Sequence, residues 1–248
     1  MNSFTAGIIV IGDEILSGRT QDTNSNFIAK NLLKEGIKLE EIIVIKDDKK
    51  TIIDQVINYS EKYSYVFTTG GIGPTHDDIT SESISEAFGL EYVVNQDAFK
   101  ILDNYYPKGE FNISRQRMAK MPIGSELILN PMTAAPGFKI NNVYVLPGVP
   151  EIMQIMFLEL IKKIKKGNPK LVTTINTNLY ESKIATFLKE IQDKYKDSSI
   201  GSYPYFNLAA KTGGVNIVVS SWNMTSVQPV VNDIVNMIKL NGGKSSIV

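Results

Sequence analysis

A glycine-rich segment with two carboxylates is the part of the sequence best suited to chemistry. It covers residues 68–80 and reads Thr-Thr-Gly-Gly-Ile-Gly-Pro-Thr-His-Asp-Asp-Ile-Thr. The apolar residues 65–67 before it predict a buried strand, and helical apolar spacing follows it. Three glycines at such a junction let the backbone approach a ligand, and the start of a helix favours a phosphate. The segment therefore predicts a phosphate-binding loop, although a glycine-rich turn with an Asp cap is the simpler alternative.

The two carboxylates of this segment, Asp77 and Asp78, would repel a bare phosphate. A divalent cation resolves the conflict, because hard cations bind Asp and phosphate oxygens together. The chain has no cysteine and a single histidine, His76, which excludes thiolate nucleophiles, zinc–cysteine sites and multi-histidine metal centres. A metal would therefore be held by carboxylate and ligand oxygens, which favours Mg²⁺ or Mn²⁺. His76 is a candidate catalytic group, but a solvent-facing loop position explains it better.

Further acidic residues follow two other expected strands. Gly12, Asp13 and Glu14 come directly after the first strand, where the two carboxylates could bind a metal or act as a base. A capped turn into a helix explains them equally well. Asp47 ends the second strand and is a candidate catalytic residue, with a solvated turn as the alternative.

Two more segments are candidates for contact with a ligand. Residues 22–24, Asp-Thr-Asn, precede a helix and form a good capping cluster, so a structural role is the better interpretation, with Asn24 kept as a possible ligand contact. Pro147 and Gly148 lie in another turn from strand to helix, whose backbone amides could form a second anion site. No Ser-His-Asp set or Walker-type lysine loop is present.

The bulk composition is that of an ordinary globular protein. The chain has 248 residues, 43% of them hydrophobic, and its 26 Lys and Arg residues balance its 26 Asp and Glu residues. No global field would therefore recruit nucleic acid or an acidic membrane. No apolar stretch reaches membrane-spanning length, and the N-terminus lacks a signal pattern, so we expect a cytoplasmic protein.

The first two-thirds of the chain alternates expected strands and helices. This alternation predicts an α/β fold in which helices cover both faces of a mostly parallel sheet. Ligands in such sheets bind beyond the carboxyl ends of the strands. The loops after Ile11, Ile45, Thr69 and Leu146 should therefore share one rim. The expected strands are residues 5–11, 42–45, 65–67, 127–129 and 143–146, and the expected helices are 26–33, 49–63, 97–105, 113–118 and 150–164.

A basic stretch with Gly and Pro, residues 162–170, reads as a linker. After it the order of elements changes to strands at 171–176, 200–205 and 215–221 and helices at 181–195 and 227–240. This order predicts a small α+β domain over residues 169–248, after a first domain over residues 1–168.

These motifs together resemble one known family. Residues 11–18, 22–24, 70–80, 135–138 and 146–151 are similar to the molybdopterin-binding-like domain of competence/damage-inducible protein A (CinA), a domain that also opens eukaryotic FAD synthases. Residues 200–204 resemble the signature of the middle domain of that family, which is KH-like. The resemblance implies a three-layer first domain and does not extend to the C-terminal nicotinamide mononucleotide deamidase domain of CinA proteins. It does not imply RNA binding, because the second domain has no Gly-x-x-Gly loop.

The resemblance also assigns residues. Asp78 and Thr80 match the shared positions of the superfamily, and Asp47 matches the acid near the pyrophosphate. The family has Gly where this chain has Lys46, so that loop could approach the ligand less closely, or the lysine could contact a phosphate. A family Thr is replaced by Ala134, which removes one side-chain contact.

The function implied by the resemblance is metal-dependent hydrolysis of a nucleotide pyrophosphate such as ADP-ribose or FAD, with Mg²⁺, Mn²⁺ or Co²⁺. The alternatives are adenylyl transfer to, or metal insertion into, molybdopterin, and a protein that binds nucleotide without turnover. A homo-oligomer, dimer or trimer, is expected from the family, with no nucleic-acid or membrane partner. Asp47 and Asp78 are the expected catalytic residues, and Asp78, Asp13 and Glu14 the expected metal ligands. The expected substrate contacts are Gly12, Asn24, Gly70, Gly71, Gly73, Pro74, Thr75, Thr80, Pro147 and Gly148.

Overall fold

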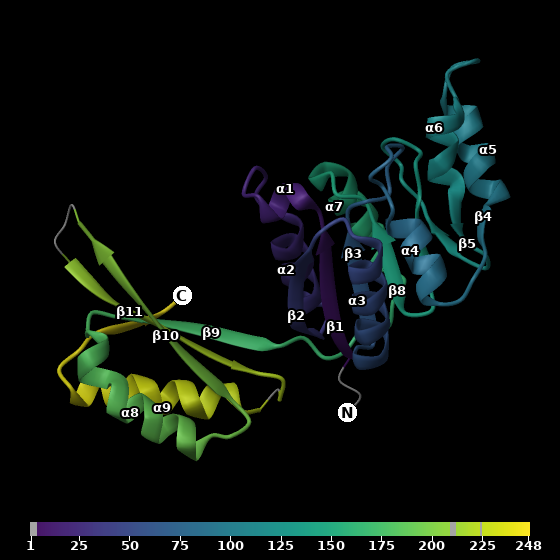
Figure 1. Cartoon of the computed structure of the whole chain (residues 1–248). Coiled ribbons are helices and arrows are strands. Elements are labelled where there is room, and N and C mark those ends of the chain that lie inside the picture. Colours follow the sequence, from purple (N-terminus) through teal and green to yellow (C-terminus); the bar gives the residue numbers. More distant parts are fainter. Residues whose placement is uncertain (1–3, 209–211, 224) are drawn as a thin grey trace. The chain divides into compact units, whose positions relative to one another are not determined.

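A computed structural model describes residues 4–208, 212–223 and 225–248 (Figure 1). The chain divides into two compact units, Met1–Gly167 and Asn168–Val248. Two clusters of buried apolar side chains lie in the first unit and a third lies in the second, and none of them draws residues from both. Each unit therefore has a core of its own.

The first unit is built around a six-stranded sheet with the order β2-β1-β3-β8-β7-β6. The four strands on one side of the sheet are parallel: β1 (Phe4–Ile11), β2 (Ile37–Ile45), β3 (Tyr65–Thr69) and β8 (Val143–Leu146). Strand β7 (Gly137–Ile140) runs antiparallel to β8 and to the edge strand β6 (Glu126–Ile128). The expected mostly parallel sheet is confirmed.

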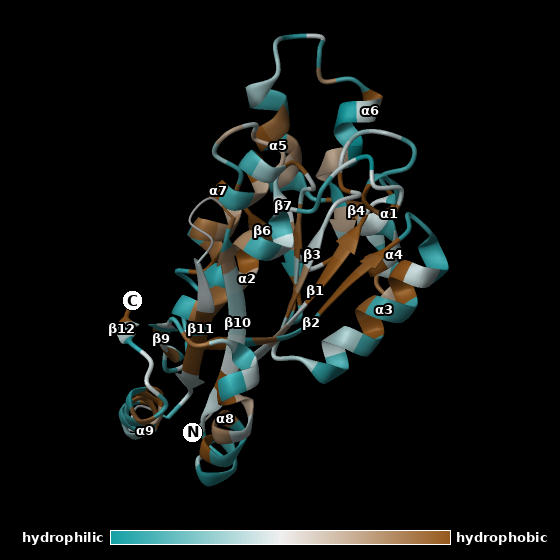
Figure 2. Cartoon of the chain, turned by 90° about the vertical axis from the view of Figure 1, so that its left-hand side faces the viewer, coloured by the Kyte–Doolittle hydropathy of each residue, from teal (hydrophilic) through white to brown (hydrophobic). Residues whose placement is uncertain are grey.

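Strand β1 shows why this sheet must be covered on both faces. Ala6, Ile8 and Val10 are buried in one apolar cluster, and the alternating residues Ile9 and Ile11 are buried in the other. Successive side chains of a strand point to opposite faces, so a continuous apolar run requires helices on both sides. Figure 2 shows the carboxyl-terminal halves of β1 and β2 as hydrophobic ribbons beside helices with mixed surfaces.

Helices supply both covering layers, which confirms the three-layer fold. Helices α2 (Asn24–Lys34) and α7 (Pro150–Leu160) contribute to the cluster on one face, for example through Ile28 and Met153. Helices α3 (Lys49–Lys62) and α4 (Thr80–Ala87) contribute to the other, for example through Ile52 and Ile84 (Figure 1). A one-turn helix, α1 (Asp13–Leu16), follows β1 directly.

Several short elements differ from the sequence prediction. Strands β4 (Tyr92–Val94) and β5 (Lys120–Pro122) pair as a two-stranded sheet that was not predicted, because three residues are too few to show alternation. Between them lie α5 (Gln96–Tyr105), α6 (Ile113–Gln116) and the 3₁₀ turn η1 (Arg117–Ala119). Strand β7 was also not predicted; it begins at Gly137, where a Cβ would lie 2.3 Å from the Val145 carbonyl oxygen. That glycine thus allows close strand packing rather than a turn.

The second unit is a small α+β domain, as expected. Its antiparallel sheet has the order β10-β11-β9-β12, and the two helices share a core with it that includes Ile184, Ile217 and Val230. The short strand β12 was not predicted. Among the described residues, no helix combines the length and the apolar character needed to cross a membrane. The elements are β9 (Leu171–Thr177), α8 (Glu181–Lys194), β10 (Ser199–Asn207), β11 (Thr212–Ser221), α9 (Val227–Leu240) and β12 (Ser245–Ile247).

Candidate functional site

A cavity of about 500 Å³ lies at the carboxyl ends of the parallel strands of the first unit. Each of the four loops expected at this rim contributes to its wall: Gly12 after β1, Asp47 after β2, Gly70 after β3 and Gly148 after β8. The shared rim is therefore confirmed. Its size suits a drug-sized or nucleotide-sized ligand.

The glycine loop forms one wall of this cavity and cannot carry side chains at two positions. Gly70 has φ 106° and Gly71 has φ 66°, in the left-handed region that favours glycine. A Cβ on Gly70 would lie 2.1 Å from the carbonyl oxygen of Ile11, and one on Gly71 would lie 2.1 Å from Thr80 Oγ1. Glycine is therefore required at both positions, because neighbouring elements leave no room for a side chain, and both residues line the cavity.

The second half of the loop is held by Asp78 rather than directed at the cavity. The Thr75 amide donates to Asp78 Oδ2 at 2.8 Å, and the Thr75 hydroxyl donates to the same oxygen. Pro74 and Thr75 are exposed and do not line the cavity, whereas Gly73 and Asp78 do. Thr80 is fully buried at the start of α4, and its amide donates to the Gly71 carbonyl. The cavity-facing part of the loop is thus residues 70–73, with Thr75 and Thr80 supporting it.

Asp47 lies partly buried next to this loop, because a Cβ on Gly71 would lie 3.6 Å from Asp47 Oδ1, and other acidic residues lie near it. The Asp13 amide donates to Asp47 Oδ2 at 3.0 Å. Burial raises the pKa of the Asp47 carboxyl, the carboxylates of Asp13, Glu14 and Asp77 raise it further, and the Asp13 amide opposes the shift. A carboxyl group with a shifted pKa in a cavity is typical of functional sites.

The charged residues that line the cavity are all acidic among those the structure describes: Glu14, Asp47, Asp77 and Asp78. Lys46, which we considered as a phosphate contact from the sequence, does not line the cavity. Its Nζ lies 3.8 Å from Asp48 Oδ2. His76 also lies outside the cavity, with 97% of its side chain exposed.

The donor set of the cavity suits a cation that prefers oxygen ligands. Asp47 and Asp78 each bind a backbone amide through Oδ2, and no hydrogen bond to Oδ1 of either occurs within the described part of the chain. No three His, Asp or Glu residues in that same part are grouped so that they could hold a metal ion by themselves. Asp13 contributes its amide rather than a cavity-lining side chain. A cation here would complete its coordination with ligand phosphates and water, as Mg²⁺ commonly does.

Asp22 and Asn24 connect the start of α2 to the cavity. Asp22 Oδ1 accepts hydrogen bonds from the amides of Asn24 (2.9 Å) and Ser25 (3.1 Å), so the expected capping role is confirmed. Asn24 is buried and lies outside the main cavity wall. Its Nδ2 donates to the Gly148 carbonyl at 2.8 Å, which fixes the turn of Pro147 and Gly148.

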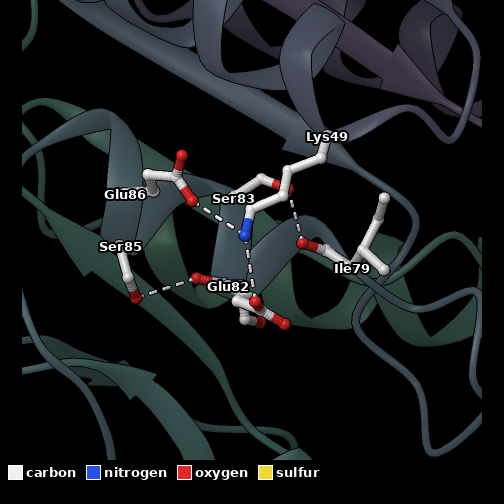
Figure 3. A network of polar contacts seen from close by, with 7 residues as sticks. Lys49, Ile79, Glu82, Ser83, Ser85 and Glu86 are labelled. Carbon is white, nitrogen blue, oxygen red and sulfur yellow. Dashed lines mark hydrogen bonds and ion pairs between the residues drawn. The ribbon is translucent and has the colours of Figure 1, made fainter.

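An ion-pair bridge joins the two helices that begin at the site. Lys49 Nζ lies 3.0 Å from Glu82 Oε1 and 2.7 Å from Glu86 Oε2. Figure 3 shows Lys49 reaching between the two glutamates of α4, next to the hydrogen bond from the Ser83 hydroxyl to the Ile79 carbonyl. Because Lys49 follows the Asp47 turn and α4 follows the glycine loop, the bridge connects two walls of the cavity.

Sequence reasoning missed part of the wall contributed by residues 130–136. Asn130 Oδ1 accepts from the amides of Met132 and Thr133, and Asn130 Nδ2 donates to Thr133 Oγ1. Thr133 lines the cavity, whereas Ala134 does not and has φ 62°. The Asn-Pro turn signal was visible in the sequence, but only the fold brings it to this rim.

Comparisons with known proteins agree with this architecture. The family described as "Probable molybdopterin binding domain" matches residues 7–166, and "FAD synthase, middle domain" matches residues 169–242. A CinA-like protein of Sulfurihydrogenibium sp. is 36% identical over 68% of the chain, and a probable FAD synthase of Caenorhabditis elegans is 33% identical over 81%. The chain spans 44% of the length of each of these two relatives.

A solved structure is also similar to part of the chain. The crystal structure of the protein CinA of Thermoplasma acidophilum, described as having unknown function, is similar with a TM-score of 0.62 and 32% identity. The similarity covers 65% of this chain and 98% of that one.

Proposed function

Because the chain belongs to the family of probable molybdopterin-binding domains and continues into a domain like the middle domain of FAD synthase, we propose that it is a metal-dependent hydrolase of a nucleotide pyrophosphate bond. The substrate class is a dinucleotide-like pyrophosphate such as ADP-ribose or FAD. The likeness to a probable FAD synthase supports a ligand of this class.

One observation carries the proposal: the glycine loop and four carboxylates line the same cavity, and no basic side chain of the described residues lines it. Glycine amides suit phosphate oxygens, but four negative side chains would repel them. A divalent cation between the carboxylates and the pyrophosphate reconciles the two. Adenylyl chemistry without such a cation would need Lys or Arg at the same wall.

Each residue group then has a distinct task. The amides of residues 71–73 would bind the pyrophosphate, since the Gly70 amide already donates to the Leu146 carbonyl. Asp78 and Glu14 would contribute oxygen ligands to the cation. Asp47 Oδ1 would accept a hydrogen bond from the attacking water, because its other oxygen is already bound to the Asp13 amide. The cation, when bound, would neutralise charge on the pyrophosphate and supply Lewis-acid activation. The water oxygen bonds to one phosphorus as the bridging P–O bond breaks, so ADP-ribose gives AMP and ribose 5-phosphate.

The direct test is to incubate the purified protein with ADP-ribose and Mg²⁺, Mn²⁺ or Co²⁺ and to quantify AMP. We expect turnover that stops with a chelator and returns with metal. Asp78→Ala and Asp47→Asn should each lower kcat/KM by tenfold or more, since tenfold corresponds to only ~1.4 kcal/mol. Asp103→Ala, an exposed carboxylate on α5 outside the cavity, is the matched control and should keep full activity.

Unchanged turnover in Asp78→Ala would show that the site is wrongly assigned. AMP production that does not depend on added metal would contradict the role given to the cation. A substrate panel that includes FAD, with products identified by mass spectrometry, then defines the nucleotide.

A second function, binding or adenylylation of molybdopterin, is favoured by the family match over residues 7–166. Retention of a fluorescent pterin through purification would support it. The third alternative, nucleotide binding without turnover, predicts a calorimetric signal with ADP-ribose or FAD and no product.

A further inference from the structure

A second, smaller cavity of about 50 Å³ adjoins the main one. It is walled by residues 20–24, Thr69 and Gly148, and we call it the niche. Glu14, Thr20 and Gly148 line both the niche and the main cavity, so the two spaces share a wall. The niche is large enough for a water molecule or one hydroxyl-bearing carbon, and too small for a sugar ring.

Two buried polar atoms of the niche residues have no partner within the described chain. Asn24 is 6% exposed, and its Nδ2 must face the Gly148 carbonyl because that oxygen can only accept. This orientation makes the other amide atom, Oδ1, a buried acceptor without a hydrogen bond. Thr69 is 1% exposed, and its hydroxyl is likewise unpartnered. Leaving such groups unsatisfied costs ~1–3 kcal/mol each, so a ligand or water is expected to pair with them.

The hydrogen-bonding capacity of Asn24 Oδ1 and of the Thr69 hydroxyl indicates which chemical group can bind in the niche. Asn24 Oδ1 needs a donor, and the Thr69 hydroxyl can donate. An alcohol or water O–H satisfies both at once, whereas an ionised phosphate oxygen has no proton to give to Asn24. The carboxylates of Glu14 and Asp22 also line the niche, and no Lys or Arg does among the described residues. A phosphate is therefore excluded from the niche on grounds of charge and of hydrogen bonding.

We propose that the niche is a hydroxyl subsite, in which Asn24 Oδ1 and the Thr69 hydroxyl recognise one alcohol group of the ligand. The ligand would be a pyrophosphate whose phosphate is followed by a hydroxylated sugar or chain, as in ADP-ribose and FAD. The shared wall brings that hydroxyl next to the pyrophosphate, which binds at the glycine loop. Asn24 then contacts the sugar portion rather than a phosphate. The inference rests on the nucleotide ligand of the proposed function but not on its turnover.

The test is calorimetry with α,β-methylene ADP-ribose, which cannot be hydrolysed, in the presence of Mg²⁺. Thr69→Val is nearly isosteric and removes only the hydroxyl, so affinity should fall about tenfold. Thr69→Ser keeps the hydroxyl and should bind like the unaltered protein. Thermal melting of both variants shows whether each is folded.

A double comparison identifies the hydroxyl. Each analogue in the set lacks one ribose hydroxyl. One of these analogues should bind the unaltered protein about tenfold more weakly than the parent compound does, and its affinity for Thr69→Val should be no lower than its affinity for the unaltered protein. Independent, multiplicative losses for every analogue would overturn the proposal. A structure of the complex with only water or a bound cation in the niche would also overturn the proposal. The proposal would likewise fail if the unaltered protein bound neither the methylene analogue nor FAD. Binding without AMP release from ADP-ribose would reject the hydrolase function and leave the subsite intact.

Discussion

Asp47 lies partly buried at the end of β2, with one carboxylate oxygen bound to the Asp13 amide and three other carboxylates nearby. Its raised pKa means that the folded protein holds the ionised carboxylate less favourably than water does. Such a residue lowers stability and is retained in proteins where it serves a site. The same reasoning applies to Ala134, a non-glycine residue at φ 62° beside the cavity wall.

The effect of Asp47 on stability has a definite pH dependence. Its folded pKa is raised above the ordinary value of 3.8, so the free energy of unfolding falls as pH rises through that raised pKa. Asp47→Asn keeps an acceptor for the Asp13 amide and removes the charge. The variant should therefore be more stable than the unaltered protein at neutral pH, and the difference should vanish as pH falls below about 3.8.

Urea unfolding at a series of pH values measures this difference. Asp54→Asn, on the exposed side of α3, is the matched control and should show no such pH-dependent gain. A variant that is less stable than the unaltered protein at pH 7 would contradict the origin assigned to the pKa shift.

At the scale of elements, the site depends on loops that follow parallel strands and on helices that begin just after them. Strands β1, β2, β3 and β8 run in the same direction, so their carboxyl ends deliver their loops to one rim. Helix α3 starts two residues after Asp47, and helix α4 starts two residues after Asp78. Lys49 of α3 forms ion pairs with Glu82 and Glu86 of α4. The geometry of the carboxylates is thus coupled to helix packing.

The Lys49 bridge should make a small, salt-sensitive contribution to stability. Its side chain is 44% exposed, and solvent screens exposed ion pairs, so their contribution to stability is small. Lys49→Met keeps most of the stem and removes the charge, so the urea midpoint of unfolding in low salt should fall slightly. The loss should shrink in 1 M NaCl, where charges are screened within ~3 Å.

Lys50→Met is the matched control, because Lys50 is exposed and makes no ion pair within the described chain. Equal losses in both variants, or a loss that does not change with salt, would show that the bridge contributes through packing of the side-chain stem instead.

At the scale of the whole molecule, the two units divide the tasks. All residues that line the main cavity and the niche lie in Met1–Gly167, which has both of its apolar clusters to itself. The second unit has a separate core around its antiparallel sheet. Chemistry and folding of the first unit therefore should not require the second.

A protein ending at Gly167 tests this independence. It should unfold in one cooperative transition and hydrolyse ADP-ribose with the kcat of the full chain. Circular dichroism during urea unfolding and AMP quantification measure the two properties. A folded first unit with at least tenfold lower kcat would instead assign a part of the active enzyme to the second unit.

Local patterns in the sequence were enough to predict the long elements and the shared rim. Each of these features depends on residues that are close together in the chain: the buried run of β1, the amphipathic spacing of α3 and the glycines between β3 and α4. The order of the motifs was enough to recognise the resemblance to the CinA family. Short strands such as β4, β5 and β12 were missed because three residues carry too little periodicity.

Strand direction and loop order are readable from the sequence, and they bring a glycine loop and acidic residues to one edge of a parallel sheet. Which of these residues face the cavity depends on the tertiary structure. It turned Thr75 toward Asp78, buried Thr80 beneath Gly71, excluded Lys46 and His76, and brought Thr133 to the wall. It also placed Asn24 and Thr69 in one niche. Side-chain direction and burial depend on contacts between residues far apart in the chain, and no local pattern encodes them.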